Sequence, residues 1–197
     1  RPLLGNSAEV VREVRDPWKL GAWLRRAGFQ FPPIRSGTAD VPPGEWLCKP
    51  FRSAGGRGIH SWKRPEESGE DSRSVRTAHT AAARLRHASG KNYLQRRIKG
   101  VPLGAVYVAA KSRATLLGVT QQLIGCPWAG ARGWWYVGSV GPVELSLPLE
   151  SEFERLGECL ASHFALEGLF GVDVILNADG VWTLEVNPRY TASVEIL

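Results

Sequence analysis

The sequence has few of the features of membrane-spanning, disulfide-rich or zinc-binding proteins. Its longest uncharged apolar run, residues 101–110, is only strand-sized, whereas a membrane-spanning helix needs about 18–20 apolar residues. We therefore expect no membrane partner. The three cysteines, Cys48, Cys126 and Cys159, are odd in number and widely spaced. This pattern argues against a disulfide framework or a cysteine-based zinc site and favours a cytoplasmic protein.

Methionine is absent, and the chain begins at Arg1 without a basic and apolar leader. We therefore expect it to be part of a longer protein. Its 197 residues are 43% hydrophobic and 22% charged, a composition typical of a globular protein with a sizeable core. The 25 lysines and arginines outnumber the 19 acidic residues. That balance is compatible with nucleic acid, a nucleotide or another anionic ligand.

The hydrophobic periodicity predicts helices interleaved with short strands. One helix is expected after the cap Asn6-Ser7, and a second begins with Asp16 as N-cap and Pro17 as first helical residue. The strongest helical pattern covers 150–166. Strands are expected at 45–49, 59–62, 93–95, 103–110, 114–123, 134–140, 168–176 and 181–186, a polar loop at 63–76 and an alanine-rich helix at 77–87. Because most strands form hairpins, we predict the α+β class with mostly antiparallel sheets.

A lysine and a glycine-rich turn form the first candidate site. Lys49 ends a strand, and Ser53, Gly55, Gly56 and Gly58 follow within nine residues. Glycines let backbone N–H groups approach an anion without a Cβ in the way, and the lysine supplies a positive charge. The segment is therefore a candidate phosphate cradle in a hairpin. A flexible hairpin turn has the same composition, so this interpretation stays open on the segment alone.

Two carboxylates and an amide form the second candidate site. Glu185 and Asn187 are two residues apart on one strand, so their side chains share a face. A two-residue loop, Asp179-Gly180, would turn Asp173 to the other face of the hairpin. A three-residue loop, 178–180, with positive φ at Gly180 would place Asp173 directly opposite Glu185. The sequence predicts this three-residue loop if the three residues act together.

Opposed carboxylates destabilise a sheet unless a cation lies between them. Mg²⁺ prefers oxygen ligands and keeps waters and phosphates in its remaining positions, so it fits Asp173, Glu185 and Asn187. The alternative is a solvated sheet face on which Arg189 neutralises the carboxylates.

The ordered set of motifs resembles the ATP-grasp superfamily. The resemblance runs from about Asp16 to Leu197. It rests on Lys49-Pro50, on Gly55-Gly56-Arg57-Gly58, on residues 93–100, on Val172-Asp173-Val174-Ile175, on Asp179-Gly180 and on residues 184–189. Residues 184–195, together with Leu4-Gly5-Asn6, are most similar to a carboligase-like branch near tyramine–glutamate ligase of methanofuran-type cofactor synthesis.

The resemblance implies an ATP-grasp fold in which two α+β subdomains clamp a nucleotide. Residues 1–44 would be helices and a linker at the end of a preceding domain. Residues 45–94 would form the small subdomain with the glycine-rich loop, and residues 95–197 the large subdomain with the metal site.

The resemblance also implies roles for the candidate residues. Lys49 would contact the α- and β-phosphates, and Arg189 would stabilise the transferred phosphate or an acyl-phosphate, which makes these two the candidate catalytic residues. Further ATP contacts would come from Ser53, Gly55, Gly56 and Gly58 over the β- and γ-phosphates, and from Gln95, Arg96 and Ile98 around adenine. Mg²⁺ or Mn²⁺ would bind Asp173, Glu185 and Asn187.

The chain departs from the superfamily's pattern at four positions. Pro17 lies where several relatives carry a second phosphate-contacting lysine, and Gln95 replaces an adenine-side glutamate. Pro102 lies near the position where relatives carry an acidic residue that contacts the ribose. Gly171 takes the place of an arginine that some ligases carry two residues before the metal aspartate.

An aromatic segment remains without an assigned role. Trp128, Trp134, Trp135 and Tyr136 could stack on adenine or on an aromatic substrate, although core packing is the more frequent role for such residues.

The first functional hypothesis is an ATP- and Mg²⁺-dependent ligase that joins a small-molecule carboxylate to an amine through an acyl-phosphate. The alternative is an ATP-grasp module that binds nucleotide without catalysis. A basic nucleic-acid binder is the weakest hypothesis, because no DNA- or RNA-binding motif is present. A homodimer is compatible with the sequence.

Overall fold

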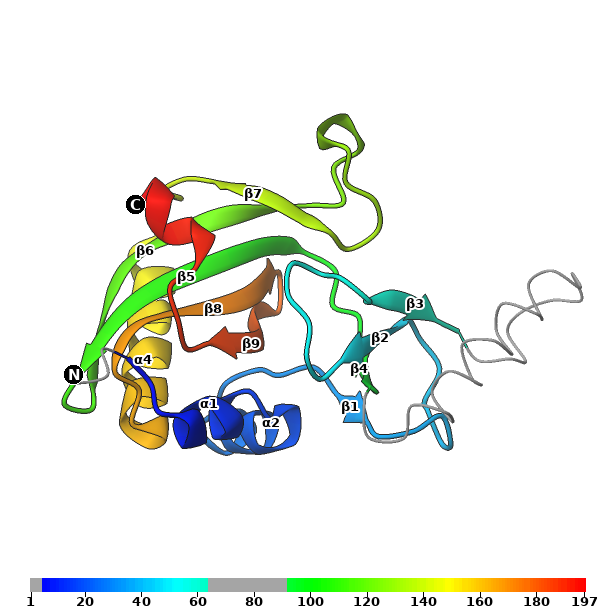
Figure 1. The fold of residues 1–197 in the computed structure, drawn as a ribbon, viewed down its shortest axis with the longest axis horizontal. Coiled ribbons are helices and arrows are strands. Elements are labelled where there is room, and N and C mark those ends of the chain that lie inside the picture. Colours follow the sequence, from blue (N-terminus) through cyan, green and yellow to red (C-terminus); the bar gives the residue numbers. More distant parts are fainter. Residues whose placement is uncertain (1–4, 64–91) are drawn as a thin grey trace, which may run out of the picture. The chain divides into compact units, whose positions relative to one another are not determined.

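The computed structural model describes residues 5–63 and 92–197 (Figure 1). The expected polar loop after Lys63 and the helix expected at 77–87 lie outside these residues. In the described part of the chain, no helix is both long enough and apolar enough to cross a membrane.

The chain forms two compact units. Unit 1 comprises residues 1–31, 99–124 and 137–197, and unit 2 comprises residues 32–98 and 125–136. This division differs from the three consecutive segments expected from the sequence, because the chain passes between the units more than once. Residues 1–31 belong to unit 1 with the long sheet, and the connection 125–136 belongs to unit 2.

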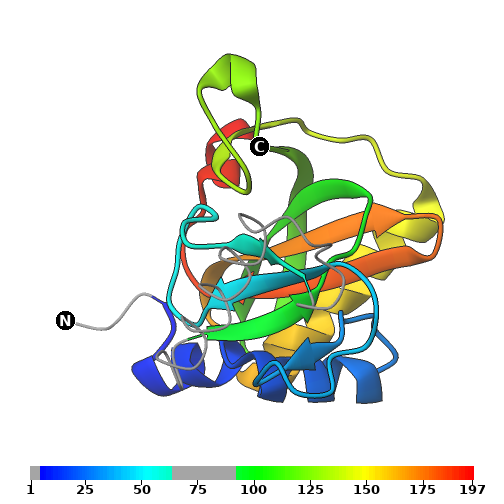
Figure 2. The same ribbon diagram turned by 90° about the vertical axis from the view of Figure 1, so that its right-hand side faces the viewer.

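Unit 1 is built on a five-stranded sheet in the order β7-β6-β5-β8-β9. The strands are β5 (Val101–Ala110), β6 (Arg113–Ile124), β7 (Tyr136–Val140), β8 (Gly168–Asn177) and β9 (Gly180–Asn187). Antiparallel registers join β5 to β6, β5 to β8 and β8 to β9. Figure 2 shows β8 and β9 side by side as a hairpin. The expected α+β class with mostly antiparallel strands is confirmed.

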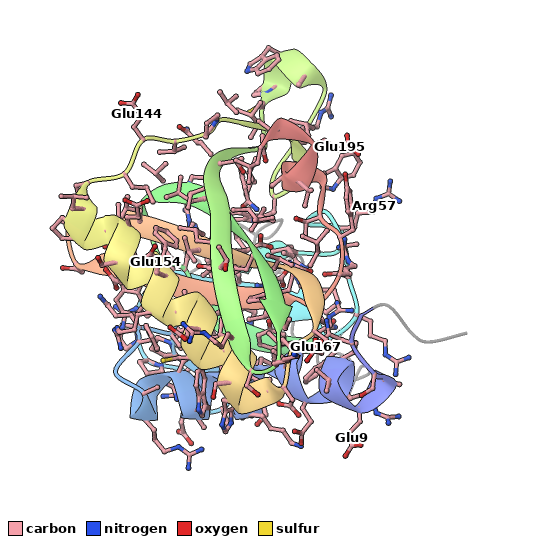
Figure 3. The ribbon with its side chains drawn as sticks, turned by 90° about the vertical axis from the view of Figure 1, so that its left-hand side faces the viewer. Glu9, Arg57, Glu144, Glu154, Glu167 and Glu195 are labelled. Atoms are coloured by element: carbon pink, nitrogen blue, oxygen red, sulfur yellow. The ribbon has the colours of Figure 1, made fainter. Side chains whose placement is uncertain are left out.

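Helix α4 (Leu147–Phe164) covers one face of this sheet, and Figure 3 shows it crossing β5 and β6. The contact is close because Gly157 lies against the ring of Tyr107. The Tyr107 hydroxyl donates to the carbonyl of Phe153 at 2.9 Å, and its ring stacks on Phe170. Burial raises the pKa of the Tyr107 phenol. This face is the apolar core of unit 1.

The opposite face carries the small and polar residues. The C-terminal 3₁₀ helix η3 (Ala192–Ile196) packs against β5 on this side. Three glycines make room for the C-terminal segment: a Cβ at Gly118 would meet Leu197, one at Gly104 would meet Ser193, and one at Gly171 would lie 2.8 Å from Cγ2 of Thr191. The candidate carboxylates lie on this face.

Two short helices complete unit 1. In α1 (Ala8–Val14) the Ser7 side chain caps the first turn. In α2 (Pro17–Arg26) the Asp16 carboxylate accepts from two backbone N–H groups, and Pro17 takes the first helical position. Both caps are as predicted. Pro17 therefore has a structural role as the start of α2.

Unit 2 contains a four-stranded antiparallel sheet in the order β1-β4-β2-β3. Its strands are β1 (Ile34–Arg35), β2 (Trp46–Pro50), β3 (His60–Trp62) and β4 (Asn92–Arg96). A small apolar core of Val41, Trp46, Cys48, Trp62 and Leu94 supports it. Burial raises the pKa of the Cys48 thiol to about 11. The alternate residues of β2 and β4 point to the other face, where Lys49 and Gln95 lie.

Candidate functional site

Lys49 and Gln95 form a buried polar pair in unit 2. Their strands pair with Lys49 opposite Tyr93 and Leu47 opposite Gln95, so the two polar side chains share a face. Lys49 is 5% exposed and Gln95 is 1% exposed. The Lys49 Nζ donates to Gln95 Oε1 at 3.0 Å. Burying an ammonium is costly unless acceptors compensate it, and Gln95 Oε1 supplies one here.

The Lys49 contact also fixes the orientation of the Gln95 amide. With Oε1 accepting from the ammonium, Nε2 points away as a hydrogen-bond donor. This Nε2 is buried and has no hydrogen-bond partner among the described residues. A buried donor without an acceptor costs about 1–3 kcal/mol. The pair therefore combines a buried positive charge with an amide N–H that a ligand acceptor would satisfy.

The glycine-rich turn follows Lys49 directly. Gly55, Gly56 and Gly58 all have positive φ, between 62° and 77°. Within the turn, the backbone N–H of Arg57 donates to Ala54 and that of Ile59 donates to Gly56. Ser53, at the entrance of the turn, is half-buried. Backbone N–H groups exposed in a tight turn with left-handed residues can form a concavity that binds anions.

The connection 125–136 backs the glycine-rich turn within unit 2. The backbone N–H of Tyr136 donates to the carbonyl of Gly55 at 3.2 Å. A Cβ at Gly56 would collide with the carbonyl oxygen of Trp134. Glycine is therefore required at position 56 by this close approach as well as by its φ.

The tryptophans of this connection differ in burial. Trp128 is 78% exposed and Trp135 is 51% exposed, so the expectation of core packing is wrong for these two. Trp134 is half-buried beneath the guanidinium of Arg97, 5.0 Å from its ring centroid. The η2 turn (Pro127–Ala129) holds Trp128 at the surface.

Arg96 ends the strand that carries Gln95, and Ile98 lies two residues beyond it. The backbone N–H of Arg96 donates to Pro33, and its exposed guanidinium lies beside Gly44. Ile98 is half-buried. Neither side chain belongs to the buried Lys49–Gln95 pair.

The candidate metal residues lie together in unit 1. Asp173 on β8 is directly opposite Glu185 on β9, and Gly171 is opposite Asn187. The Asn187 Nδ2 donates to Asp173 Oδ2 at 3.0 Å and to Glu185 Oε1 at 3.4 Å. The expectation that all three side chains share one face is met.

The loop expected to produce this arrangement is not the one observed. Asn177 pairs with Gly180, so the loop has two residues, Ala178 and Asp179, rather than three. The Asn177 side chain accepts from the backbone N–H of Asp179 at 2.9 Å, and Gly180 has the expected positive φ, 111°. The extra residue lies farther along β9. Val174 pairs with Thr183 and Asp173 with Glu185, so Leu184 is a β-bulge.

The donor set fits a hard divalent cation. Two carboxylates and one amide supply oxygen ligands of the kind that Mg²⁺ binds. The described residues contain no group of three His, Cys, Asp or Glu side chains suited to a metal, so such a site depends on the Asn187 oxygen. In the structure the Asn187 nitrogen faces the carboxylates, and binding a cation would require its amide to turn over.

Arg189 follows the cluster but lies at the surface. Its Nη1 donates to the carbonyl of Tyr190 at 2.8 Å, and its backbone N–H donates to Asn187. The structure thus gives this guanidinium a backbone acceptor rather than one of the two carboxylates.

One polar residue of the cluster was not found from the sequence. Gln122 on β6 donates from Nε2 to Asp173 Oδ1 at 2.8 Å. Its signal is a second polar residue, Thr120, two positions earlier on the same face of β6, although Gln121 lies between them and points to the other face. That signal becomes useful only when the order of the strands is known.

The chain is similar to known proteins over nearly its whole length. A family model described as an ATP-grasp domain matches residues 14–193. An ATP-grasp superfamily protein from Archaeoglobus fulgidus is 21% identical with a TM-score of 0.64, and the match covers 97% of this chain and 50% of that one. No curated protein matches the chain.

Two solved enzymes share the fold at lower identity. Biotin carboxylase from Campylobacter jejuni, solved with an ATP derivative, is 15% identical with a TM-score of 0.73, covering 98% of this chain and 44% of that one. D-alanyl-alanine synthetase A from Vibrio cholerae is 14% identical with a TM-score of 0.70, covering 94% and 58%. The chain spans about half the length of these proteins.

Proposed function

The chain belongs to the ATP-grasp domain family, and from that premise we propose that it is an ATP-dependent carboxylate–amine ligase. The observation that carries the proposal is the opposition of Asp173 and Glu185 with Asn187 beside them, on the face where Gly104 and Gly171 leave room. Opposed carboxylates of this kind are stabilised by a cation that also contacts phosphates.

Unit 2 supplies the features expected of a phosphate site. Its described residues carry eight lysines and arginines against two acidic residues, Asp40 and Glu45. Within it, the Lys49 ammonium would contact the α- and β-phosphates, and the unpartnered Gln95 Nε2 would donate to the nucleotide. The backbone N–H groups of 53–58 would receive the β- and γ-phosphates. Arg96 and Ile98 would contact the adenine base of ATP.

The proposed reaction has two steps. A substrate carboxylate oxygen attacks the γ-phosphorus of ATP, and the bond to the bridging oxygen breaks to release ADP. An amine nitrogen then attacks the acyl carbon of the acyl-phosphate, loses a proton and expels inorganic phosphate. Such chemistry depends on positioning and on neutralising developing negative charge rather than on a protein nucleophile.

Mg²⁺ or Mn²⁺ held by Asp173, Glu185 and Asn187 would neutralise phosphate charge in both steps. The Arg189 guanidinium would turn from the Tyr190 carbonyl to contact the transferred phosphate. Lys49 would be the second positively charged catalytic side chain. We infer that the substrates resemble those of the tyramine–glutamate ligase branch, because residues 184–195 carry that likeness. We further propose that the protein is cytoplasmic, acts in cofactor biosynthesis and forms a homodimer.

Hydroxylamine provides the test that does not require the natural amine. The protein, ATP and Mg²⁺ are incubated with candidate carboxylic acids and hydroxylamine, which traps an acyl-phosphate as a coloured ferric hydroxamate. Hydroxamate that depends on both the acid and ATP supports the ligase. ADP release without hydroxamate for every acid would contradict the acyl-phosphate step.

One observation favours a second function, a nucleotide-binding module without catalysis. Gly171 lies where some ligases carry an arginine, and a Cβ there would press on Thr191, so an arginine side chain has no room. ATP binding in calorimetry, with no ADP formed for any acid, would identify this function.

A further inference from the structure

The hydrogen bond between Gln122 and Asp173 crosses a whole strand of the sheet. Gln122 lies on β6 and Asp173 on β8, and β5 runs between them. The bond length is nevertheless 2.8 Å. Neighbouring strands lie about 4.8 Å apart, so the two side chains together span two strand spacings above β5.

Gly104 is the residue of β5 beneath this bond. It pairs with Thr120 on one side and with Asp173 on the other. A Cβ at Gly104 would lie 3.3 Å from Gln122 Nε2 and 3.3 Å from Ser193 Oγ. The φ of Gly104 is outside the left-handed region, so the backbone does not require glycine. A glycine inside a strand lowers stability, and here it leaves room for two side chains, those of Gln122 and Ser193.

Asp173 is held from both sides by amides. Oδ1 accepts from Gln122, and Oδ2 accepts from Asn187. Asn187 is itself a proposed ligand whose amide would turn over toward a cation. The Gln122 bond can persist through that change, because it occupies the other oxygen of Asp173.

We propose that Gln122 is a positioning residue of the cation site, which orients the Asp173 carboxylate through a bond that the absence of a side chain at Gly104 permits. It leaves Oδ2 directed toward Asn187 and Glu185 and so raises the affinity of the site for a divalent cation. This inference rests on the proposed function in one respect, since it takes Asp173 and Glu185 as cation ligands.

The test measures Mn²⁺ binding to the full chain in the presence of a non-hydrolysable ATP analogue, with free Mn²⁺ followed by electron paramagnetic resonance. Gln122→Leu should weaken Mn²⁺ binding about 10-fold, as loss of a residue that orients a metal ligand commonly does. Gly104→Ala should weaken binding less, because a Cβ 3.3 Å from Gln122 Nε2 shifts the amide without removing it. The double variant should be no weaker than Gln122→Leu alone, because both changes act on the same bond.

Gln121→Leu is the matched control, since Gln121 is exposed and points to the other face of β6. It should leave the affinity unchanged. Should Gln122→Leu fail to fold, Gln122→Met keeps the side-chain length without the donor. Additive losses in the double variant would overturn the role of Gln122 but not the cation site. Mn²⁺ affinity unchanged by the Gln122 variants would do the same. A wild-type chain that binds no Mn²⁺ would instead overturn the cation site itself.

Discussion

Asp173 lies directly opposite Glu185 because Leu184 is an extra residue in β9. Next to the turn, the register of the hairpin pairs Asn177 with Gly180 and Val174 with Thr183. Continued without change, that register would place Asp173 opposite Leu184 and turn Glu185 to the other face. The bulge adds one residue to β9 and so restores Glu185 to the face of Asp173.

Glu185→Gln should abolish ATP turnover while preserving the fold. The substitution removes the charge that a divalent cation requires and keeps the shape of the side chain. We expect acid-dependent ADP release to fall about 100-fold or more, the scale of losing an electrostatic contact to a reacting phosphate. Thermal unfolding should change little. Glu154→Gln, on the exposed side of α4 (Figure 3), is the control and should retain activity. Full turnover by the Glu185 variant would rule out the cation site.

The shared face of Glu185 and Asn187 was predictable from sequence, but the position of Asp173 was tied to a three-residue loop, and that loop was wrong. Alternation along β9 places Glu185 and Asn187 together, and the glycine at 180 marks the turn. Leu184 has no local feature that distinguishes it from any apolar strand residue. A bulge depends on how one strand twists against its partner, which is a property of the assembled sheet.

The same limit applies to Gln122 and Trp128. Gln122 reaches Asp173 only because β5 lies between β6 and β8 and carries Gly104 at that point. Trp128 has an apolar side chain that composition assigns to the core, yet the η2 turn exposes 78% of it. Both outcomes depend on contacts between segments far apart in the chain.

Lys49→Met should weaken ATP binding by about 1–3 kcal/mol, since a charge-assisted contact to phosphate is lost while the buried stem is retained. Isothermal calorimetry measures the change. Lys63→Met, an exposed lysine of unit 2, should have a far smaller effect. Equal ATP affinity in the Lys49 variant and the wild type would exclude Lys49 from the phosphate site.

ATP should protect the glycine-rich turn from hydrogen exchange. Arg57 and Ile59 already donate within the turn, so the amides of Gly55, Gly56 and Gly58 are those available to phosphate. We expect residues 52–58 to exchange rapidly without nucleotide and slowly with it. Protection should be lost in Lys49→Met at the same ATP concentration. Identical exchange with and without ATP in the wild type would show that the turn does not contact phosphate.

Cys48 should make folding stability fall at alkaline pH. Burial raises its pKa to about 11 from the usual 9.0, so the folded chain holds this proton more tightly than the unfolded chain does. The resulting stability is complete below about pH 9 and is lost as pH rises from 9 toward 11. Urea unfolding of the wild type and Cys48→Ala, compared at several pH values, isolates the contribution. A difference between them that stays constant from pH 8 to 11 would contradict the shift.

Gly56→Ala and Gly55→Ala should differ sharply although both residues have positive φ. At Gly55, φ is 62° and a Cβ would meet nothing within 4 Å, so alanine costs only the backbone strain, roughly 1–2 kcal/mol. At Gly56 the strain is similar, but the Cβ would also collide with the Trp134 carbonyl. That carbonyl belongs to a connection held by the bonds from Gly125 to Trp135 and from Tyr136 to Gly55, so it cannot move without cost.

We therefore expect Gly56→Ala to destabilise the protein by about 1–3 kcal/mol more than Gly55→Ala, the usual range for forcing an atom into an occupied space. Chemical denaturation measures both changes, and the intrinsic fluorescence of the tryptophans reports whether the connection 125–136 shifts. Because Gly55→Ala carries the same added methyl group and the same kind of backbone strain, any excess in the Gly56 variant comes from the Trp134 contact. Equal losses would mean that the turn and the connection separate freely, and that the close approach does not shape the phosphate cradle.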